Sequence, residues 1–117
     1  MAQAIRILVV EDEPIVAISL QDMLGDLGYD VVGPAFRVAS ALALAEAEAI
    51  DAAILDVNMA GEDSYAVAYA LRARSIPYLF ATGYGRQGLE PGHDDVPVLQ
   101  KPYRESQVDA ALKELLG

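Results

Sequence analysis

The sequence has 117 residues, a formal net charge of −10 and a hydrophobic content of 54%, with no cysteine and a single histidine. A chain of this length forms one domain, and a hydrophobic content this high excludes a disordered chain. The composition also excludes disulfides, cysteine nucleophiles, thiolate metal sites and any site built from several histidines.

The distribution of charged and apolar residues limits the kinds of partner. The eight basic residues are scattered and form no basic stripe, which argues against binding to nucleic acid. No apolar run approaches the ~20 residues that cross a membrane, and the N-terminus lacks the pattern of a signal peptide. We therefore expect a single domain over residues 1–117, cytoplasmic, that binds neither a membrane nor nucleic acid.

Five short apolar segments are typical of buried β-strands. Their hydrophobicity is nearly continuous, as in the strands of a parallel sheet that is covered on both faces. The predicted strands are Ile5–Val10, Asp30–Val32, Ala52–Val57, Tyr78–Ala81 and Val96–Leu99.

Apolar residues at helical spacing fill most of the intervals between these strands. The first helix begins at Pro14 and ends before Gly28, because proline suits a first helical turn and glycine a helix end. Further helices are predicted over 38–49, 64–74 and 106–116. The interval 83–95 contains four glycines and a proline, so we expect at most a turn or two of helix there. Strands that alternate with helices predict a doubly wound α/β fold.

Polar residues follow four of the five predicted strands. In an open α/β sheet the carboxyl ends of parallel strands lie at one edge, which is where ligands bind. Each of these residues has an ordinary explanation when it is taken alone, as a helix cap, a turn residue or a surface charge. Their convergence on one edge indicates a site, which would be formed by Glu11, Asp12, Asp56, Thr82 and Lys101.

The residue types at this edge are those that phosphoryl transfer requires. Three carboxylates near one point repel one another unless a cation joins them, and Mg²⁺ suits oxygen ligands in a shell completed by water. Asp56 then remains ionised and can attack phosphorus to form an acyl phosphate. The Lys101 ammonium and the Thr82 hydroxyl can stabilise the charge on the transferring group.

The order of these motifs resembles the receiver domain of two-component response regulators. The matching pieces are Val10–Glu13, Leu55–Met59, Ala81–Gly83 and Lys101–Pro102, and the similarity covers essentially the whole chain. The resemblance implies a flavodoxin-like, doubly wound sheet of five parallel strands in the order 2-1-3-4-5, with flanking helices. The glycine-rich interval implies that the fourth helix is short or irregular here. The Lys101–Pro102 peptide bond is expected to be cis.

The resemblance also implies roles for the acidic residues. Asp56 would accept a phosphoryl group from a histidine kinase or a phosphotransfer protein. Mg²⁺ would be bound by the side chains of Asp12 and Asp56 and by the backbone carbonyl of Asn58, with Glu11 beside it through water. The chain would be a phosphoprotein in a phosphorelay and not a turnover enzyme, apart from the loss of its own phosphate.

The remaining roles follow from the same resemblance. Thr82 would move toward the phosphoryl group, and Lys101 would pair with Asp56 or with that group. Val98 stands where the family usually has the tyrosine or phenylalanine of a rotameric switch, so the usual coupling of that ring to Thr82 is not expected. The runs Phe80–Gly85 and Lys101–Tyr103 resemble the FAT GUY subgroup, whose members are single-domain regulators or belong to kinases of the HWE type.

Because no output domain follows the last predicted helix, we expect a single-domain protein that signals through protein–protein contact as a monomer or weak dimer. A piece of a hybrid sensor kinase is the alternative. A phosphatase of the haloacid dehalogenase type would need an aspartate where Asn58 stands, and a flavin carrier would need a phosphate-binding loop in place of Glu11–Glu13. A receiver-like protein that signals without phosphate would not need the complete set of site residues.

The single histidine, His93, lies in a polar segment of the sequence. We expect its side chain to be solvated and not to carry a phosphoryl group.

Overall fold

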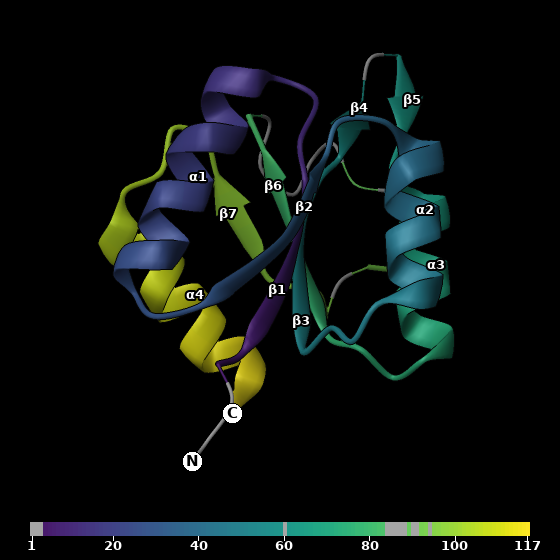
Figure 1. Ribbon diagram of the computed structural model, residues 1–117. Coiled ribbons are helices and arrows are strands. Elements are labelled where there is room, and N and C mark those ends of the chain that lie inside the picture. The colour runs from purple at the N-terminus through teal and green to yellow at the C-terminus, as the bar shows by residue number, and fades with distance from the viewer. Residues whose placement is uncertain (1–3, 60, 84–88, 90–91, 94) are drawn as a thin grey trace.

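The computed structural model describes residues 4–59, 61–83, 89, 92–93 and 95–117, and its main sheet has five parallel strands (Figure 1). The order across the sheet is β2-β1-β3-β6-β7. Counted along the chain, these five strands have the order 2-1-3-4-5, so the predicted flavodoxin-like fold is confirmed. The strands are β1 (Arg6–Val10), β2 (Asp30–Ala35), β3 (Ala52–Asp56), β6 (Tyr78–Thr82) and β7 (Val98–Gln100).

Two helices cover each face of this sheet (Figure 1). On one face lie α1 (Pro14–Asp26) and α4 (Glu105–Leu116), and on the other lie α2 (Val38–Ala47) and α3 (Tyr65–Ala73). Each helix begins within one residue of its predicted start. No helix among the described residues is long and apolar enough to cross a membrane.

The core consists of two layers because successive side chains of a strand point to opposite faces. Ile7 and Val9 of β1 pack against residues of α1 and α4, whereas Leu8 and Val10 pack on the side of α2 and α3. All four side chains are at most 1% exposed. This burial on both faces is the physical reason for the continuous apolar character of the strands.

The edges of the sheet differ from the prediction. Strand β2 continues to Ala35, through Gly33 and Pro34, and its pairing with β1 shifts register between Leu8 and Val10. Gly33 has φ +93°, and a Cβ atom there would lie 2.7 Å from the Ala35 nitrogen. Strand β7 begins at Val98 and not at Val96.

The structure also contains a small antiparallel pair that the sequence did not predict. It is formed by β4 (Asn58–Met59) and β5 (Glu62–Asp63), directly after β3. Strands of two residues carry no periodicity, so no sequence pattern indicates them. The pair leads the chain from the end of β3 to the start of α3.

The glycine-rich interval is only partly described. Residues 84–88, 90–91 and 94 lie outside the described residues, and most of the expected short or irregular fourth helix falls on them. The described residues of the interval lie in no helix or strand. His93 is 2% exposed, so the prediction of a solvated side chain is wrong.

Candidate functional site

The predicted site residues lie at the carboxyl edge of the sheet. Glu11 follows β1, Asp56 and Thr82 are the last residues of β3 and β6, and Lys101 follows β7. Glu11, Asp56 and Thr82 are 2%, 6% and 4% exposed, so their polar groups act in surroundings with little water. A cavity of about 630 Å³ opens at this edge, lined by Asp12, Glu13, Asp56, Val57, Asn58, Thr82, Gly83 and Lys101.

Lys101 links two of the buried carboxylates. Its Nζ lies 2.8 Å from Oε2 of Glu11 and 3.2 Å from Oδ2 of Asp56. Its backbone N–H donates a hydrogen bond to the carbonyl of Thr82 at 2.9 Å. This bond continues the pairing of β6 with β7 and fixes the position of the Lys101 backbone at the edge of the site. Burial alone would lower the pKa of Lys101, but hydrogen bonding and attraction to Glu11 and Asp56 outweigh burial and raise it. Lys101 is therefore a permanent cation in the site.

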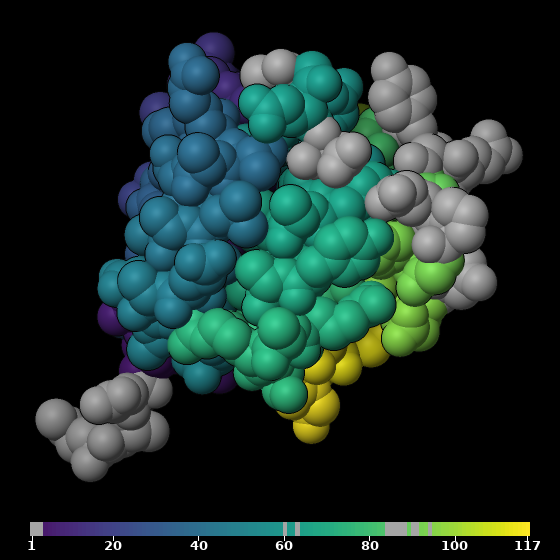
Figure 2. All heavy atoms as spheres, turned by 90° about the vertical axis from the view of Figure 1, so that its right-hand side faces the viewer, coloured from purple at the N-terminus to yellow at the C-terminus, as the bar shows by residue number. Residues whose placement is uncertain are grey.

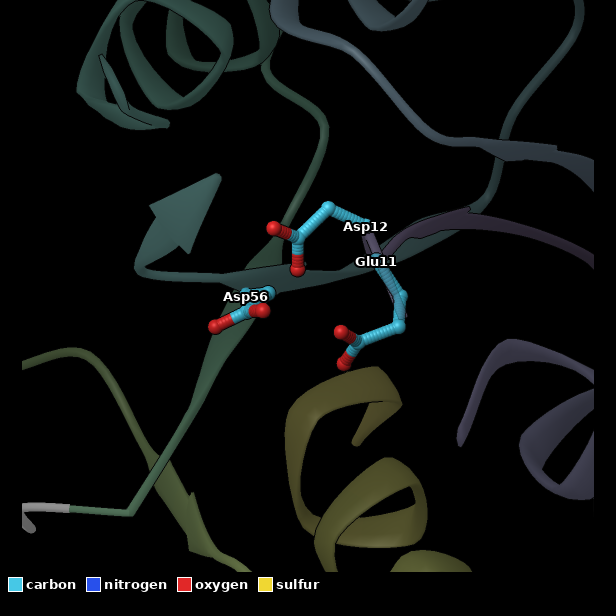
Figure 3. A group of neighbouring side chains, drawn as sticks. All are labelled: Glu11, Asp12 and Asp56. Atoms are coloured by element: carbon cyan, nitrogen blue, oxygen red, sulfur yellow. The ribbon is translucent and has the colours of Figure 1, made fainter. Parts of the chain in front are cut away.

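Three carboxyl groups lie together beside this ammonium. One oxygen each of Glu11, Asp12 and Asp56 lies within 4.8 Å of the other two. Figure 3 shows Asp12 and Asp56 reaching toward the same space, with Glu11 to one side. One ammonium does not balance three carboxylates, so the site needs another cation or a proton. Clustered carboxylate oxygens facing a cavity suit a hard divalent ion such as Mg²⁺, which keeps several of its waters.

The excess negative charge of the site is reflected in the pKa of the Asp56 carboxyl group. Burial, and then the hydrogen bond and repulsion from Glu11, raise its pKa from 3.8 to about 7, although Lys101 acts in the opposite direction. The backbone N–H of Asn58 donates to Oδ1 of Asp56 at 3.3 Å. Without a metal ion the raised pKa favours the protonated form of Asp56 up to near neutral pH, and a cation in the cavity would favour its ionised form.

Sequence reasoning missed two features of the site. The ion pair between Glu11 and Lys101 was not predicted, although Glu11 was expected to lie beside the site. Tyr103, three residues along from Gln100 at the end of β7, has a buried hydroxyl without a hydrogen-bond partner among the described residues. Burial and then the nearby Glu11 raise the pKa of Tyr103 to about 12. Neither feature has a local sequence signal, because each depends on strands brought together by the sheet.

Comparison with known protein families gives one assignment for nearly the whole chain. The response regulator receiver domain family matches residues 7–113. The transcriptional regulatory protein AruR of Pseudomonas aeruginosa is 31% identical over 126 residues, which cover 99% of this chain and 51% of AruR. The chain spans about half the length of the curated relatives it matches.

Solved structures with the same fold include two informative receivers. The solution structure of SdrG from Sphingomonas melonis Fr1 is 48% identical, covers all of both chains and superposes with a TM-score of 0.88. SdrG has also been solved in a BeF3-activated conformation, with 47% identity and a TM-score of 0.84. The receiver domain of the sensor histidine kinase PA1611 from Pseudomonas aeruginosa PAO1, with magnesium in its active site cleft, is 25% identical over 98% of this chain and 99% of that one, with a TM-score of 0.82.

Proposed function

The chain belongs to the response regulator receiver domain family, and from this membership we propose that it accepts a phosphoryl group on Asp56 in the presence of Mg²⁺ and signals through protein–protein contact. Receiver domains of two-component systems are signalling modules and not turnover enzymes, which answers the alternative of a phosphatase.

One observation carries the proposal. The Lys101 ammonium lies 3.2 Å from Asp56 and 2.8 Å from Glu11, within a cluster of three carboxyl groups that borders an open cavity. A purely structural ion pair would not need three carboxyl groups at one point, because they repel one another. A site that receives a phosphoryl group and a divalent cation needs this combination of charges.

The metal would be held by oxygen atoms that surround the cavity. We assign the side chains of Asp12 and Asp56 and the backbone carbonyl of Asn58 as ligands, with Glu11 acting through water. When bound, Mg²⁺ would balance the negative charge of the carboxylates and of the incoming phosphoryl group. Magnesium in the cleft of the PA1611 receiver supports the assignment by similarity.

The transfer itself would use three side chains. An ionised Asp56 oxygen forms a bond to phosphorus while the bond from phosphorus to the donor histidine nitrogen breaks. The donor ring carries a proton on its other nitrogen before transfer, so it leaves as a neutral imidazole and Asp56 holds the acyl phosphate. Lys101 and the Thr82 hydroxyl would hold the phosphoryl oxygens, Lys101 as a cation and Thr82 as a hydrogen-bond donor. Thr82 ends β6, and its backbone carbonyl accepts a hydrogen bond from the backbone N–H of Lys101, so both side chains start from adjacent strands beside the cavity.

The donor we propose is a histidine kinase, of the HWE or a related type, or a phosphotransfer protein. Either a stand-alone regulator or the receiver of a hybrid sensor kinase would use the site in this way.

Incubation with acetyl phosphate tests the proposal without knowledge of the donor. Intact mass is recorded with Mg²⁺ or with EDTA for the wild type, for Asp56→Asn and for Asp22→Asn, which removes the same charge from an exposed position of α1. One phosphoryl adduct is expected in the wild type and in Asp22→Asn, only with Mg²⁺. An adduct of equal yield in Asp56→Asn would overturn the assignment of Asp56.

A further inference from the structure

His93, the chain's single histidine, is seated among aromatic rings on the face of the sheet that carries α2 and α3. Its ring stacks on Tyr65 at 4.9 Å between centroids with an interplanar angle of 28°, and it meets Phe80 edge to face at 5.3 Å and 83°. Tyr69 stacks at 6.0 Å. Figure 2 shows this face, with α2 and α3 side by side and light-green residues of the chain between β6 and β7 next to α3. The imidazole thus joins that part of the chain to α3 and β6.

The buried position of the His93 ring among Tyr65, Tyr69 and Phe80, called its seat below, leaves one polar atom without a hydrogen bond to any described residue. The Nδ1 atom of His93 is buried and has no hydrogen-bond partner among the described residues, and a buried polar atom without a partner opposes folding. Ring stacking must outweigh that cost for the seated form to be populated. The buried position of His93 therefore depends on its contacts with these rings.

Both main ring partners are tied to the phosphorylation site. Tyr65 begins α3, and the N–H of Ser64, the residue before it, donates at 3.1 Å to the carbonyl of Val57, which follows Asp56. Phe80 lies two residues before Thr82 on β6 and pairs with Leu55 of β3. The seat of His93 is thus built on the chain segments that leave Asp56 and that deliver Thr82.

We propose that the seated His93 belongs to the unphosphorylated form and that phosphorylation of Asp56 releases it. This inference rests on the proposed function. A phosphoryl group adds charge and three acceptor oxygens at the end of β3, and it recruits donors from the segments after Asp56 and at Thr82. Closely packed rings do not follow such a movement continuously but change between distinct arrangements. Release of His93 converts the event at Asp56 into a change at the surface beside α3.

Thermodynamic linkage makes the proposal quantitative. If phosphorylation favours release, then loss of the buried position of His93 must favour the phosphorylated form, by up to the same factor. His93→Ala, which removes the ring, should therefore bind the phosphoryl mimic beryllofluoride more tightly than the wild type. His93→Phe retains a ring for stacking and removes the unpartnered nitrogen, so it should bind beryllofluoride more weakly than His93→Ala.

The single histidine allows a direct test on the wild-type protein. Diethyl pyrocarbonate modifies accessible imidazoles, and His93 is the only imidazole in the sequence. His93→Phe measures the absorbance change that comes from the reaction of other groups. The rate is measured with Mg²⁺ alone and with Mg²⁺ plus beryllofluoride, and fluorine NMR of the same sample records whether beryllofluoride is bound. Asp56→Asn serves as the control that lacks the acceptor.

The experiment distinguishes failure of the proposed release of His93 from failure of the proposed phosphorylation of Asp56. We expect bound beryllofluoride to raise the modification rate about fivefold or more, near the lower end of typical coupling between sites, with no change in Asp56→Asn. An unchanged rate with beryllofluoride bound would overturn the release of His93 and leave the proposed function intact. Absence of bound beryllofluoride would overturn the proposed function and this inference with it.

Discussion

At the scale of single residues, charge balance decides the behaviour of the site. Glu11, Asp12 and Asp56 share one edge of the sheet, and Lys101 contributes a single positive charge between Glu11 and Asp56. The excess negative charge is relieved either by a proton, which the raised pKa of Asp56 reflects, or by a divalent cation. A proton and the proposed Mg²⁺ would therefore compete for the same carboxyl group.

The raised pKa of Asp56 predicts how stability depends on pH without metal. The pKa is about 7 in the folded state and 3.8 as the reference, so between these values the folded state holds a proton that the unfolded state has released. The contribution of Asp56 to stability therefore falls as the pH rises from about 4 to about 7 and stays low above that. Asp56→Asn should remove this dependence and raise the free energy of unfolding at pH 8 by about 1–3 kcal/mol.

Urea unfolding in EDTA at pH 5.5 and pH 8 checks this prediction. The difference in stability between Asp56→Asn and the wild type should be about half as large at pH 5.5, midway between the two pKa values, as at pH 8. Asp22→Asn, on the exposed face of α1, should follow the wild type at both. Parallel pH profiles for Asp56→Asn and the wild type would show that Asp56 has an ordinary pKa.

The ion pairs of Lys101 predict a second effect. Lys101→Ala leaves two buried carboxylates without their cation, and removal of one partner of a buried pair typically costs 3–5 kcal/mol. Because the Lys101 side chain is 20% exposed, we expect a loss of about 2 kcal/mol at pH 8 in EDTA. Addition of Asp56→Asn should recover most of that loss, and urea unfolding of the two single variants and the double variant measures it. Additive effects of the two substitutions would contradict the coupling.

At the scale of elements, the pairing of β1 with β2 depends on one glycine. Gly33 lies within β2 at φ +93°, and a Cβ atom there would meet the Ala35 nitrogen at 2.7 Å and the Val9 carbonyl oxygen at 3.2 Å. The backbone of β2 follows β1 closely at this point, immediately before β1 delivers Glu11 to the site. The N–H of Glu11 in turn donates to the carbonyl of Ala35 at 3.0 Å.

Two glycine substitutions therefore have opposite expected effects. Gly33→Ala should destabilise the protein by more than ~1 kcal/mol, because the backbone conformation and the close contacts both disfavour a side chain. Gly25→Ala, in α1 with no atom within 4 Å of its Cβ position, should stabilise it by about 0.5–1 kcal/mol. Thermal unfolding measures both changes. A stable Gly33→Ala protein would show that β2 relaxes away from β1.

The elements also show what the sequence could and could not predict. Continuous apolar runs identified the three central strands β1, β3 and β6, because burial on both faces leaves few polar positions there. The edge strands β2 and β7 are partly exposed, and their predicted bounds were less accurate. The end of β2 was missed because Gly33–Pro34 has the composition of a turn. The burial of His93 was missed because its polar neighbours in the sequence say nothing of the rings that α3 and β6 bring to it. Likewise, the Glu11–Lys101 pair exists only because the sheet brings the ends of β1 and β7 together.

At the scale of the whole molecule, the net charge of −10 adds to the local repulsion at the carboxyl edge. A divalent cation that binds the folded form there stabilises the fold by mass action. At a free Mg²⁺ concentration of about 100 times the dissociation constant, the gain is about 2.7 kcal/mol. The parallel sheet, which gathers the ends of four strands at one edge, makes this single site possible.

Thermal unfolding with increasing MgCl₂ tests this linkage. The unfolding temperature of the wild type and of Asp22→Asn should rise with Mg²⁺ at constant ionic strength. Asp12→Asn, which removes one of the proposed oxygen ligands, should lose most of the rise. An equal rise in Asp12→Asn would mean that Mg²⁺ acts elsewhere or by general screening.

The measurement that tests the central claim most directly is the location of the phosphoryl group. Protein treated with acetyl phosphate and Mg²⁺ is reduced with borohydride, which converts a phosphorylated aspartate to homoserine, and is then digested with trypsin. The peptide 38–72 contains Asp51, Asp56 and Asp63, so its fragment masses distinguish the acceptor from its neighbours. We predict homoserine at position 56 alone. Homoserine at another aspartate, or a phosphoryl group retained on His93, would contradict the account.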